Sequence, residues 1–186
     1  MVPADSPIRC GWAGTAPEYV AYHDYEWGRV LHGDQAMFER LSLEAFQSGL
    51  SWITILRKRE AFRVAFAGFD IASVAAFTEA DVRRLMADTT IVRNRAKIDA
   101  TVSNARAVTD LGESLSDMLW SFAPEPAPAP RTPADVPATT TESTAMAKAL
   151  KRRGFRFVGP TTAYALMQAT GMVNDHLADC WVRDES

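Results

Sequence analysis

The sequence predicts an all-α fold, a compact helical bundle that forms a single domain over residues 1–186. Three observations lead to this expectation. Apolar residues recur at helical spacing over most of the chain, residues that favour helix ends stand where these segments begin and stop, and no alternation of apolar and polar residues is long enough to build a sheet. Hydrophobic residues make up 47% of the chain, which is enough to fill a core.

The first half of the chain is expected to contain four helices, each with a recognisable start. Pro17 suits a first helical turn, where its missing N–H is not needed. Asp34 and Ser51 have side chains that can cap a helix, and Thr78 with Asp81 resembles a capping box. These helices are expected over residues 17–27, 34–45, 51–66 and 78–87.

The second half should contain four more helices, interrupted by a proline-rich stretch. Six prolines within residues 123–137 exclude regular structure and predict an extended, polyproline-like connector on the surface. Gly154 and Gly171 are typical of helix C-termini, and Pro160 suits a helix start. The helices of this half are expected over residues 93–111, 119–122, 143–154 and 160–171.

Charge and hydropathy limit the partners. The net charge of −3 gives no overall positive field of the kind that attracts nucleic acid. No segment has the ~18 consecutive apolar residues of a membrane span, and no secretory signal is evident, so we expect a cytoplasmic protein without a membrane partner. Basic residues nevertheless form three clusters, each either a DNA contact or a solvated helix face. These clusters lie within residues 57–59, 93–97 and 148–156.

Two cysteines and two histidines at opposite ends of the chain have the composition of a closed tetrahedral zinc site. Cys10 and His23 lie near the start, and His176 and Cys180 near the finish. The last two are four residues apart, a spacing that on a helix places both side chains on one face. A zinc ion there would join the two termini. Spacing alone leaves a disulfide, or two unrelated buried thiols, as alternatives.

Residues 148–171 have the pattern of a helix–hairpin–helix motif, with the turn at Gly159. Free backbone N–H groups at the start of the second helix can bind a phosphate, and the basic Lys151 and Arg156 lie beside that turn. Contacts of this kind hold a protein on DNA without reading its sequence. The alternative is an ordinary loop between packed helices.

A second cluster of interest combines one carboxylate with aromatic side chains. Glu44 lies within an otherwise apolar helical segment; it is either a functional buried acid or an ordinary surface glutamate. Four aromatic residues accompany it, two of them close in sequence to the expected metal ligands. A base flipped out of DNA needs aromatic walls of this kind. The four are Trp12, Tyr22, Trp27 and Trp52.

Five segments resemble the DNA-3-methyladenine glycosylase I family of the helix–hairpin–helix superfamily. The resemblance runs from about Arg9 to Cys180 and keeps the order and spacing of the motifs. It implies a structural zinc bound by Cys10, His23, His176 and Cys180. It also implies a base pocket formed by Glu44, Tyr22 and Trp52 and lined by Trp12 and Trp27. The segments are Cys-Gly-Trp at 10–12, Tyr-His-Asp-Tyr-Glu-Trp-Gly at 22–28, Gly-Leu-Ser-Trp-Ile-Thr-Ile-Leu at 49–56, Arg-Gly-Phe-Arg-Phe-Val-Gly at 153–159 and Val-Asn-Asp-His at 173–176.

The resemblance implies base-excision repair: removal of 3-methyladenine from alkylated double-stranded DNA by a monomer that leaves an abasic site and releases the free base. Glu44 is the expected catalytic residue. Thr161 stands where related lyases place a Schiff-base lysine, which predicts an enzyme that does not cut the strand. Asp175 either orients the attacking water or supports the zinc ligands.

The turn between the pocket helix and the Trp52 helix is expected to contact DNA. Gln47, Gly49 and Leu50 form this turn, and a side chain there can fill the gap left by a flipped nucleotide.

Some features depart from the family or favour other functions. Ala45-Phe46 replaces a Gly-Gln pair, so that part of the pocket wall or DNA contact is expected to differ. A non-catalytic, zinc-stapled DNA-binding module would need the metal site and the hairpin, but not an acid among aromatics. A metallohydrolase is disfavoured because four protein ligands leave zinc no position for water.

Overall fold

The structure of the chain is a computed structural model that describes residues 7–185. Within this range every regular element is a helix and no strand is present, which confirms the predicted all-α class. The α-helices are α1 (Pro17–Tyr25), α2 (Asp34–Gln47), α3 (Trp52–Ala65), α4 (Ile71–Ala75), α5 (Glu79–Ala87), α6 (Arg95–Thr109), α7 (Leu115–Trp120), α8 (Thr141–Arg152) and α9 (Pro160–Ala169). Short 3-10 helices cover Gly11–Ala13, Ala67–Phe69, Pro133–Asp135 and Arg183–Glu185. No helix in the described range is long and apolar enough to cross a membrane.

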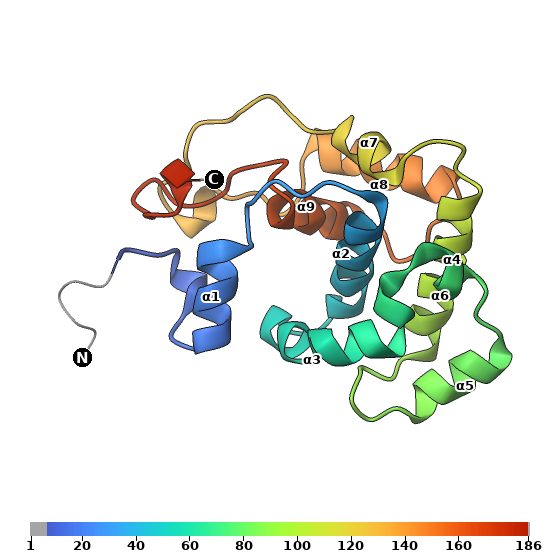
Figure 1. Cartoon of the computed structure of the whole chain (residues 1–186). Helices are drawn as coiled ribbons and strands as arrows, with labels where there is room; N and C mark the ends of the chain where they lie inside the picture. Colours follow the sequence, from blue (N-terminus) through green and yellow to red (C-terminus); the bar gives the residue numbers. More distant parts are fainter. Residues whose placement is uncertain (1–6, 186) are drawn as a thin grey trace.

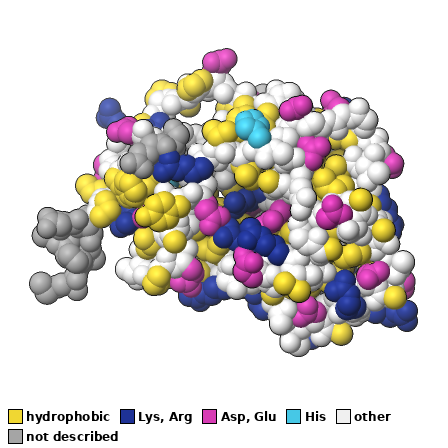
Figure 2. Space-filling model, viewed as in Figure 1, with side chains coloured by type: hydrophobic (Ala, Val, Ile, Leu, Met, Phe, Trp, Pro, Cys, Tyr) yellow, Lys and Arg dark blue, Asp and Glu magenta, His cyan; other side chains and the backbone are white. Residues whose placement is uncertain are grey.

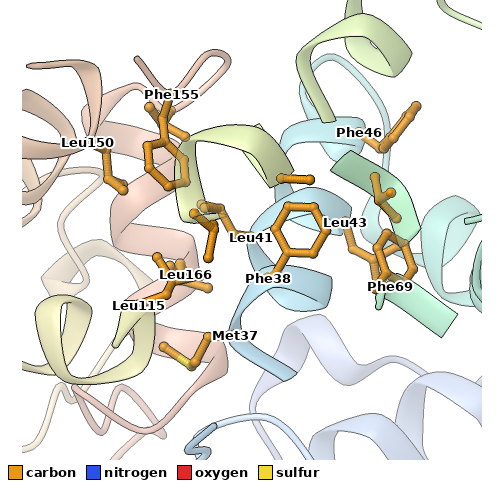
Figure 3. Close-up of a cluster of buried hydrophobic side chains, with 14 of the residues drawn as sticks. Met37, Phe38, Leu41, Leu43, Phe46, Phe69, Leu115, Leu150, Phe155 and Leu166 are labelled. Carbon is orange, nitrogen blue, oxygen red and sulfur yellow. The ribbon is translucent and has the colours of Figure 1, made fainter. Parts of the chain in front are cut away.

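Helix α2 lies near the middle of the molecule and packs against α3, α6, α7 and α9 (Figure 1). Figure 3 shows its side chains Met37, Phe38, Leu41, Leu43 and Phe46 among buried residues of the surrounding elements. The last two turns of α2 are buried on nearly every side, so little of this part of the helix can face water. Glu44 is carried into the interior by this burial.

The helices α2, α3 and α5 begin within one residue of the expected positions, but two of the three expected caps make different side-chain bonds. Thr78 and Asp81 form the predicted capping box, with the Thr78 N–H donating to the Asp81 carboxylate at 2.9 Å. Asp34 does not cap its own helix; its carboxylate accepts from the Ser114 hydroxyl at 2.7 Å, at the start of α7. Ser51 stands at the N-cap of α3, but its hydroxyl pairs with that of Thr54 at 2.8 Å.

Most helix boundaries lie within about two residues of expectation, but two boundaries and one helix need comment. α1 ends at Tyr25, so Trp27 lies in the turn that follows it. α7 begins at Leu115 rather than near residue 119, because Ser114 caps it. α4 was not expected, although Asp70 caps it by accepting from the Ser73 N–H at 2.8 Å.

The two ends of the described chain meet beside α1 (Figure 1). The Trp181 N–H donates to the Ile8 carbonyl at 3.0 Å. The C-terminal segment passes close to the chain after α1 at Gly171, where φ is +76° and an added Cβ would lie 2.8 Å from the backbone of Arg29. Only glycine fits this crossing, which brings the C-terminal segment to the N-terminal residues.

Candidate active site and metal centre

A cavity of about 350 Å³ opens among α1, α2, α3, α9 and the C-terminal segment. Aromatic side chains form much of its wall, together with two carboxylates. It contains all five residues expected for base binding and catalysis, as well as Gln47 and Asp175. Its lining comprises Cys10, Gly11, Trp12, Tyr19, Tyr22, Trp27, Glu44, Gln47, Trp52, Pro133, Val136, Ala165, Gln168, Asp175 and Leu177.

Glu44 is the buried acid of this cavity. The residue is only 6% exposed, so the alternative of an ordinary surface glutamate is wrong. Its carboxylate has no hydrogen-bond partner among the described residues. Burial raises its pKa to about 7, and the positive charge of Arg40 opposes this shift. The site therefore holds an acid that a cationic ligand would stabilise in its charged form.

The aromatic residues form a continuous set of edge and tilted contacts. The ring centroids of Tyr22 and Trp52 are 5.3 Å apart, and those of Trp12 and Trp27 are 4.9 Å apart. Trp12 also lies 6.4 Å from the ring of Tyr22 and 5.1 Å from the ring of His23. The base-pocket residues and one expected metal ligand thus share a single packed unit.

Asp175 lies in the cavity wall and is fixed by α9. Its Oδ2 accepts from the Tyr164 hydroxyl at 2.6 Å and from the Gln168 side-chain amide at 2.9 Å. Neither bond involves a histidine ligand. Asp175 is thus held by two side chains of α9 and also lines the cavity.

The four expected metal ligands meet at one buried point. The ligand atoms of Cys10, His23, His176 and Cys180 all lie within 4.8 Å of one another. Both cysteines are free thiols, so the disulfide alternative is wrong. His176 and Cys180 do not share a helix, as their spacing had suggested; they lie on a turn closed by the bond from the Cys180 N–H to the Leu177 carbonyl at 2.9 Å.

The geometry of this cluster fits a tetrahedral metal. Cys180 Sγ lies 3.5 Å from both His23 Nε2 and His176 Nδ1, and Cys10 Sγ lies 3.7 Å from His176 Nδ1. Tetrahedral zinc, with bonds of about 2.3 Å to sulfur and about 2.0 Å to nitrogen, separates such atoms by about 3.5 Å. The four residues could therefore hold a divalent metal ion.

Neighbouring groups orient both imidazoles for that role. His23 Nδ1 pairs with Asp24 at 2.8 Å, and Asp24 is held in turn by Arg9. His176 Nε2 pairs with the Trp27 carbonyl at 3.1 Å. In each ring one nitrogen is thereby engaged and the other faces the thiols, the usual arrangement around ligand histidines.

The expected hairpin joins α8 to α9. Gly159 is the N-cap of α9, and Pro160 is its first residue. Asn104 on α6 pairs with the Arg156 backbone in both directions: its amide donates to the carbonyl at 3.1 Å, and its oxygen accepts from the N–H at 2.8 Å. Lys151 and Arg156 are both exposed beside the turn. The hairpin is thus fixed to α6 through Asn104, and its two basic side chains remain exposed to solvent.

The turn between α2 and α3 is also well fixed. Gly49 has a φ of +82°, and the Gln47 amide donates to the Leu50 carbonyl at 2.8 Å. Leu50 remains 38% exposed at its tip. The sequence left Lys97 either in a DNA contact or on a solvated helix face. It is neither, because it is buried and donates to the carbonyls of Phe46 and Ser48 at 2.9 and 2.6 Å.

Comparisons with known proteins agree with this geometry. A family profile described as methyladenine glycosylase matches residues 12–184. The chain belongs to the methyladenine glycosylase family. DNA-3-methyladenine glycosylase 1 of Escherichia coli is 48% identical over 178 residues, which cover 92% of this chain and 95% of the relative. DNA-3-methyladenine glycosylase of Haemophilus influenzae is 45% identical over 177 residues, covering 92% and 96%.

Solved structures of the family share the fold. A crystal structure of 3-methyladenine DNA glycosylase I superposes with a TM-score of 0.90 at 46% identity, covering 94% of this chain and 98% of that one. A Staphylococcus aureus structure described as the basis of 3-methyladenine recognition gives a TM-score of 0.90 at 35% identity, covering 94% and 96%. The predicted family and enzyme class are confirmed.

The methyladenine glycosylase fold also brings residues to the cavity that sequence reasoning missed. Tyr19 and Gln168 lie on α1 and α9, and Pro133 and Val136 come from the proline-rich stretch. Thr132 and Asp135 have capping-box spacing, and the Thr132 N–H donates to the Asp135 carboxylate at 2.8 Å. The spacing of Thr132 and Asp135 could have predicted, from the sequence, an ordered turn in this stretch.

Ala45 and Phe46, the departure from the methyladenine glycosylase pattern, lie outside the cavity wall. Both are buried, and the Phe46 ring packs 4.7 Å from that of Phe62 on α3. The expectation that they form a different pocket wall is therefore wrong, since neither lines the cavity and Phe46 packs in the core between α2 and α3. Their effect on a DNA contact stays a prediction.

Proposed function

We propose that this methyladenine glycosylase removes 3-methyladenine from alkylated double-stranded DNA by hydrolysis of the N-glycosyl bond and leaves an abasic site. The observation that carries the proposal is one buried carboxylate, that of Glu44, facing a cavity walled by aromatic rings. Relatives of the same family are named for 3-methyladenine, and one solved relative holds that base.

Charge distinguishes the damaged base from normal adenine. Methylation at N3 places positive charge on the adenine ring while it is bound to deoxyribose. Aromatic faces attract such a cation by about 0.5–2 kcal/mol per contact, and Tyr22 and Trp52 supply two of them. The Glu44 carboxylate adds electrostatic attraction and accepts hydrogen bonds from the base edge. Normal adenine is neutral and gains little from either.

The chemical step needs little from the protein, because the cationic base is already a good leaving group. Water attacks C1′ as the glycosidic bond breaks, through an oxocarbenium-like state. The bonding electrons stay with the base, which leaves as neutral 3-methyladenine, and the water releases one proton to solvent as it becomes the C1′ hydroxyl. We assign orientation of this water to Asp175, which lines the same cavity and is held by Tyr164 and Gln168. Asp175→Asn should lower kcat and leave binding of free 3-methyladenine unchanged; weakened binding with unchanged kcat would contradict the assignment.

The enzyme should not cut the DNA strand. Thr161 lies in the first turn of α9, next to Pro160, and carries no amine that could form a Schiff base. Incubation with alkylated DNA and borohydride should therefore trap no protein. A covalent protein–DNA adduct would contradict this.

Two surfaces are assigned to DNA. The Gly159 turn, with Lys151 and Arg156, binds backbone phosphate, and the turn formed by Gln47, Gly49 and Leu50 fills the gap left by the flipped base.

Leu50→Ala is the test of the second surface. It should weaken binding to lesion-containing DNA several-fold, because the exposed Leu50 side chain would no longer fill the gap, and should leave the dissociation constant of free 3-methyladenine unchanged. Equal effects on DNA and on free base would reject the role of this turn.

Zinc is the metal we assign to the cluster of Cys10, His23, His176 and Cys180, because two thiolates and two imidazoles are its common ligand set. All four positions are then filled by protein, so the ion has a structural role and supplies no nucleophile. Metal analysis of purified protein should give about one zinc per chain.

We further expect the chain to act as one domain and as a monomer, in the cytoplasm where bacterial DNA lies. Light scattering of the protein alone and with a lesion duplex tests the oligomeric state.

The decisive experiment measures release of free 3-methyladenine from alkylated duplex DNA. Wild-type protein should release the base, and Glu44→Gln should reduce the rate at least tenfold while circular dichroism stays unchanged. The rival function, a zinc-stapled DNA-binding module without catalysis, would bind the duplex but release no base.

A further inference from the structure

Arg40 is a nearly buried cation that the recognition scheme above does not use. It lies on α2, one turn before Glu44, and its side chain is 11% exposed. Its Nη1 donates to the Tyr22 hydroxyl oxygen at 3.0 Å. The guanidinium carbon lies 5.5 Å from the ring centroid of Tyr22 and 6.0 Å from that of Trp52. Both rings line the cavity and Arg40 does not, so Arg40 contacts them from outside it.

The hydrogen bond from Arg40 fixes the role of the Tyr22 hydroxyl. A phenol oxygen that accepts from a guanidinium turns its own hydrogen away from that cation. A phenol has an ordinary pKa of about 10, so it keeps this hydrogen at neutral pH. The hydroxyl can then donate to an acceptor on the cavity side, such as an unmethylated ring nitrogen of a bound purine.

The guanidinium itself is held in place by a network that joins three helices. Arg40 Nη2 lies 3.7 Å from the carboxylate of Glu26, the residue that follows α1. Arg59 on α3 donates two bonds to the same carboxylate, at 2.5 and 2.9 Å. Figure 2 shows basic and acidic side chains side by side on the face between α1 and α2. Such a paired, half-buried network restrains Arg40 far more than an isolated surface ion pair would.

From these contacts we propose that Arg40 is a positioning residue for base recognition, holding the Tyr22 and Trp52 rings as one wall and directing the Tyr22 O–H into the cavity. This inference rests on the proposed function, because the wall it describes is the one assigned to 3-methyladenine. Arg40 touches no base; it acts through Tyr22.

A double-mutant cycle tests the coupling. Arg40→Met and Tyr22→Phe are made singly and together, and both the dissociation constant of free 3-methyladenine and kcat/KM for its excision are measured. Arg40→Met alone should weaken base binding about tenfold, the scale of one charge-assisted hydrogen bond. In the Tyr22→Phe background it should cost less than about threefold, since the hydroxyl that it directs is gone. Effects that multiply would overturn the proposal.

Two further variants separate positioning from general stability. Arg63→Met removes a matched arginine, which joins α3 to α2 through Glu39 at 2.8 Å and touches neither ring, and it should leave base binding unchanged. Arg40→Lys keeps the charge and one donor and should restore part of the binding. If Arg63→Met weakens binding as much as Arg40→Met, the proposal fails. Failure of wild-type protein to release base would instead reject the proposed function.

Discussion

At the scale of single residues, the buried Glu44 carboxylate destabilises the folded protein when it is charged, and the proposed function uses that charge to recognise the base. Its carboxylate is buried without a hydrogen-bond partner among the described residues, and its pKa is raised to about 7 from an ordinary value of 4.5. The folded protein therefore binds this proton more tightly than the unfolded chain does. The stability that the neutral acid contributes is present below pH 4.5 and is lost as pH rises through about 7.

Glu44→Gln should thus stabilise the protein at alkaline pH. Removing the buried charge gains on the order of 3 kcal/mol at pH 8 relative to pH 4.5, because each unit of pKa shift corresponds to about 1.4 kcal/mol. Urea unfolding at the two pH values measures this difference. Glu60→Gln is the control, since Glu60 is exposed and should show no such trend. A Glu44→Gln variant that is less stable than wild type at pH 8 would show that the carboxylate is not destabilising.

The same titration should appear in catalysis. Attraction of a cationic base requires the charged carboxylate, so kcat/KM should fall as pH drops through about 7. The acid limb of the profile should be absent from Glu44→Gln, which excises slowly at every pH. A profile for wild type that stays flat down to pH 5.5 would contradict this role of Glu44.

At the scale of elements, the end of α2 organises the site. Its last turn presents Glu44, the turn after it presents Leu50, and α3 then begins at Trp52. The buried ammonium of Lys97 satisfies the carbonyls of Phe46 and Ser48, which have no partner within α2. A cation at a helix C-terminus is also favoured by the helix dipole. One side chain on α6 therefore fixes the junction between the pocket and the turn that we assign to DNA.

Lys97→Met should loosen this junction. Leaving two carbonyls unpaired should cost about 1–3 kcal/mol of unfolding free energy. The Michaelis constant for alkylated DNA should rise more than the dissociation constant of free base. Lys58→Met is a matched control, because Lys58 donates to the Thr90 carbonyl at 2.8 Å in an exposed position. If Lys97→Met and Lys58→Met change the unfolding free energy and the Michaelis constant equally, Lys97 does not fix this junction.

Features that depend on nearby residues were predictable from the sequence. The capping box of α5, the hairpin prolines and glycines and the aromatic pocket residues follow from local patterns or from family motifs. Features set by distant partners were not. Asp34 binds Ser114 instead of its own helix, and Lys97 turns inward to carbonyls about fifty residues away in the sequence. Pro133 and Val136 reach the cavity from a stretch that is joined to the C-terminal segment, where the Pro130 carbonyl accepts from the Ala178 N–H at 2.8 Å.

At the scale of the whole molecule, the cluster of Cys10, His23, His176 and Cys180 links the two chain ends to the pocket. Trp12 stands two residues after Cys10, and its ring lies 5.1 Å from that of His23; the Trp27 ring lies 4.7 Å from that of His176. Asp175 directly precedes His176. Residues that line one side of the cavity are therefore neighbours of the proposed metal ligands. In this fold, the contacts that bring the two termini together also position Trp12 and Trp27 in the cavity wall.

Metal removal should accordingly affect both stability and base binding. A metal that binds only the folded chain stabilises it by about 4 kcal/mol when its free concentration is a thousand times its dissociation constant. Cys180→Ser, or a strong chelator, should lower the unfolding midpoint and weaken binding of free 3-methyladenine through the displaced Trp12 wall. Helices α2 to α9 should keep most of their circular dichroism, because their core is separate from the metal cluster. Cys180→Ser protein with wild-type stability and base affinity would show that the metal does not support the pocket.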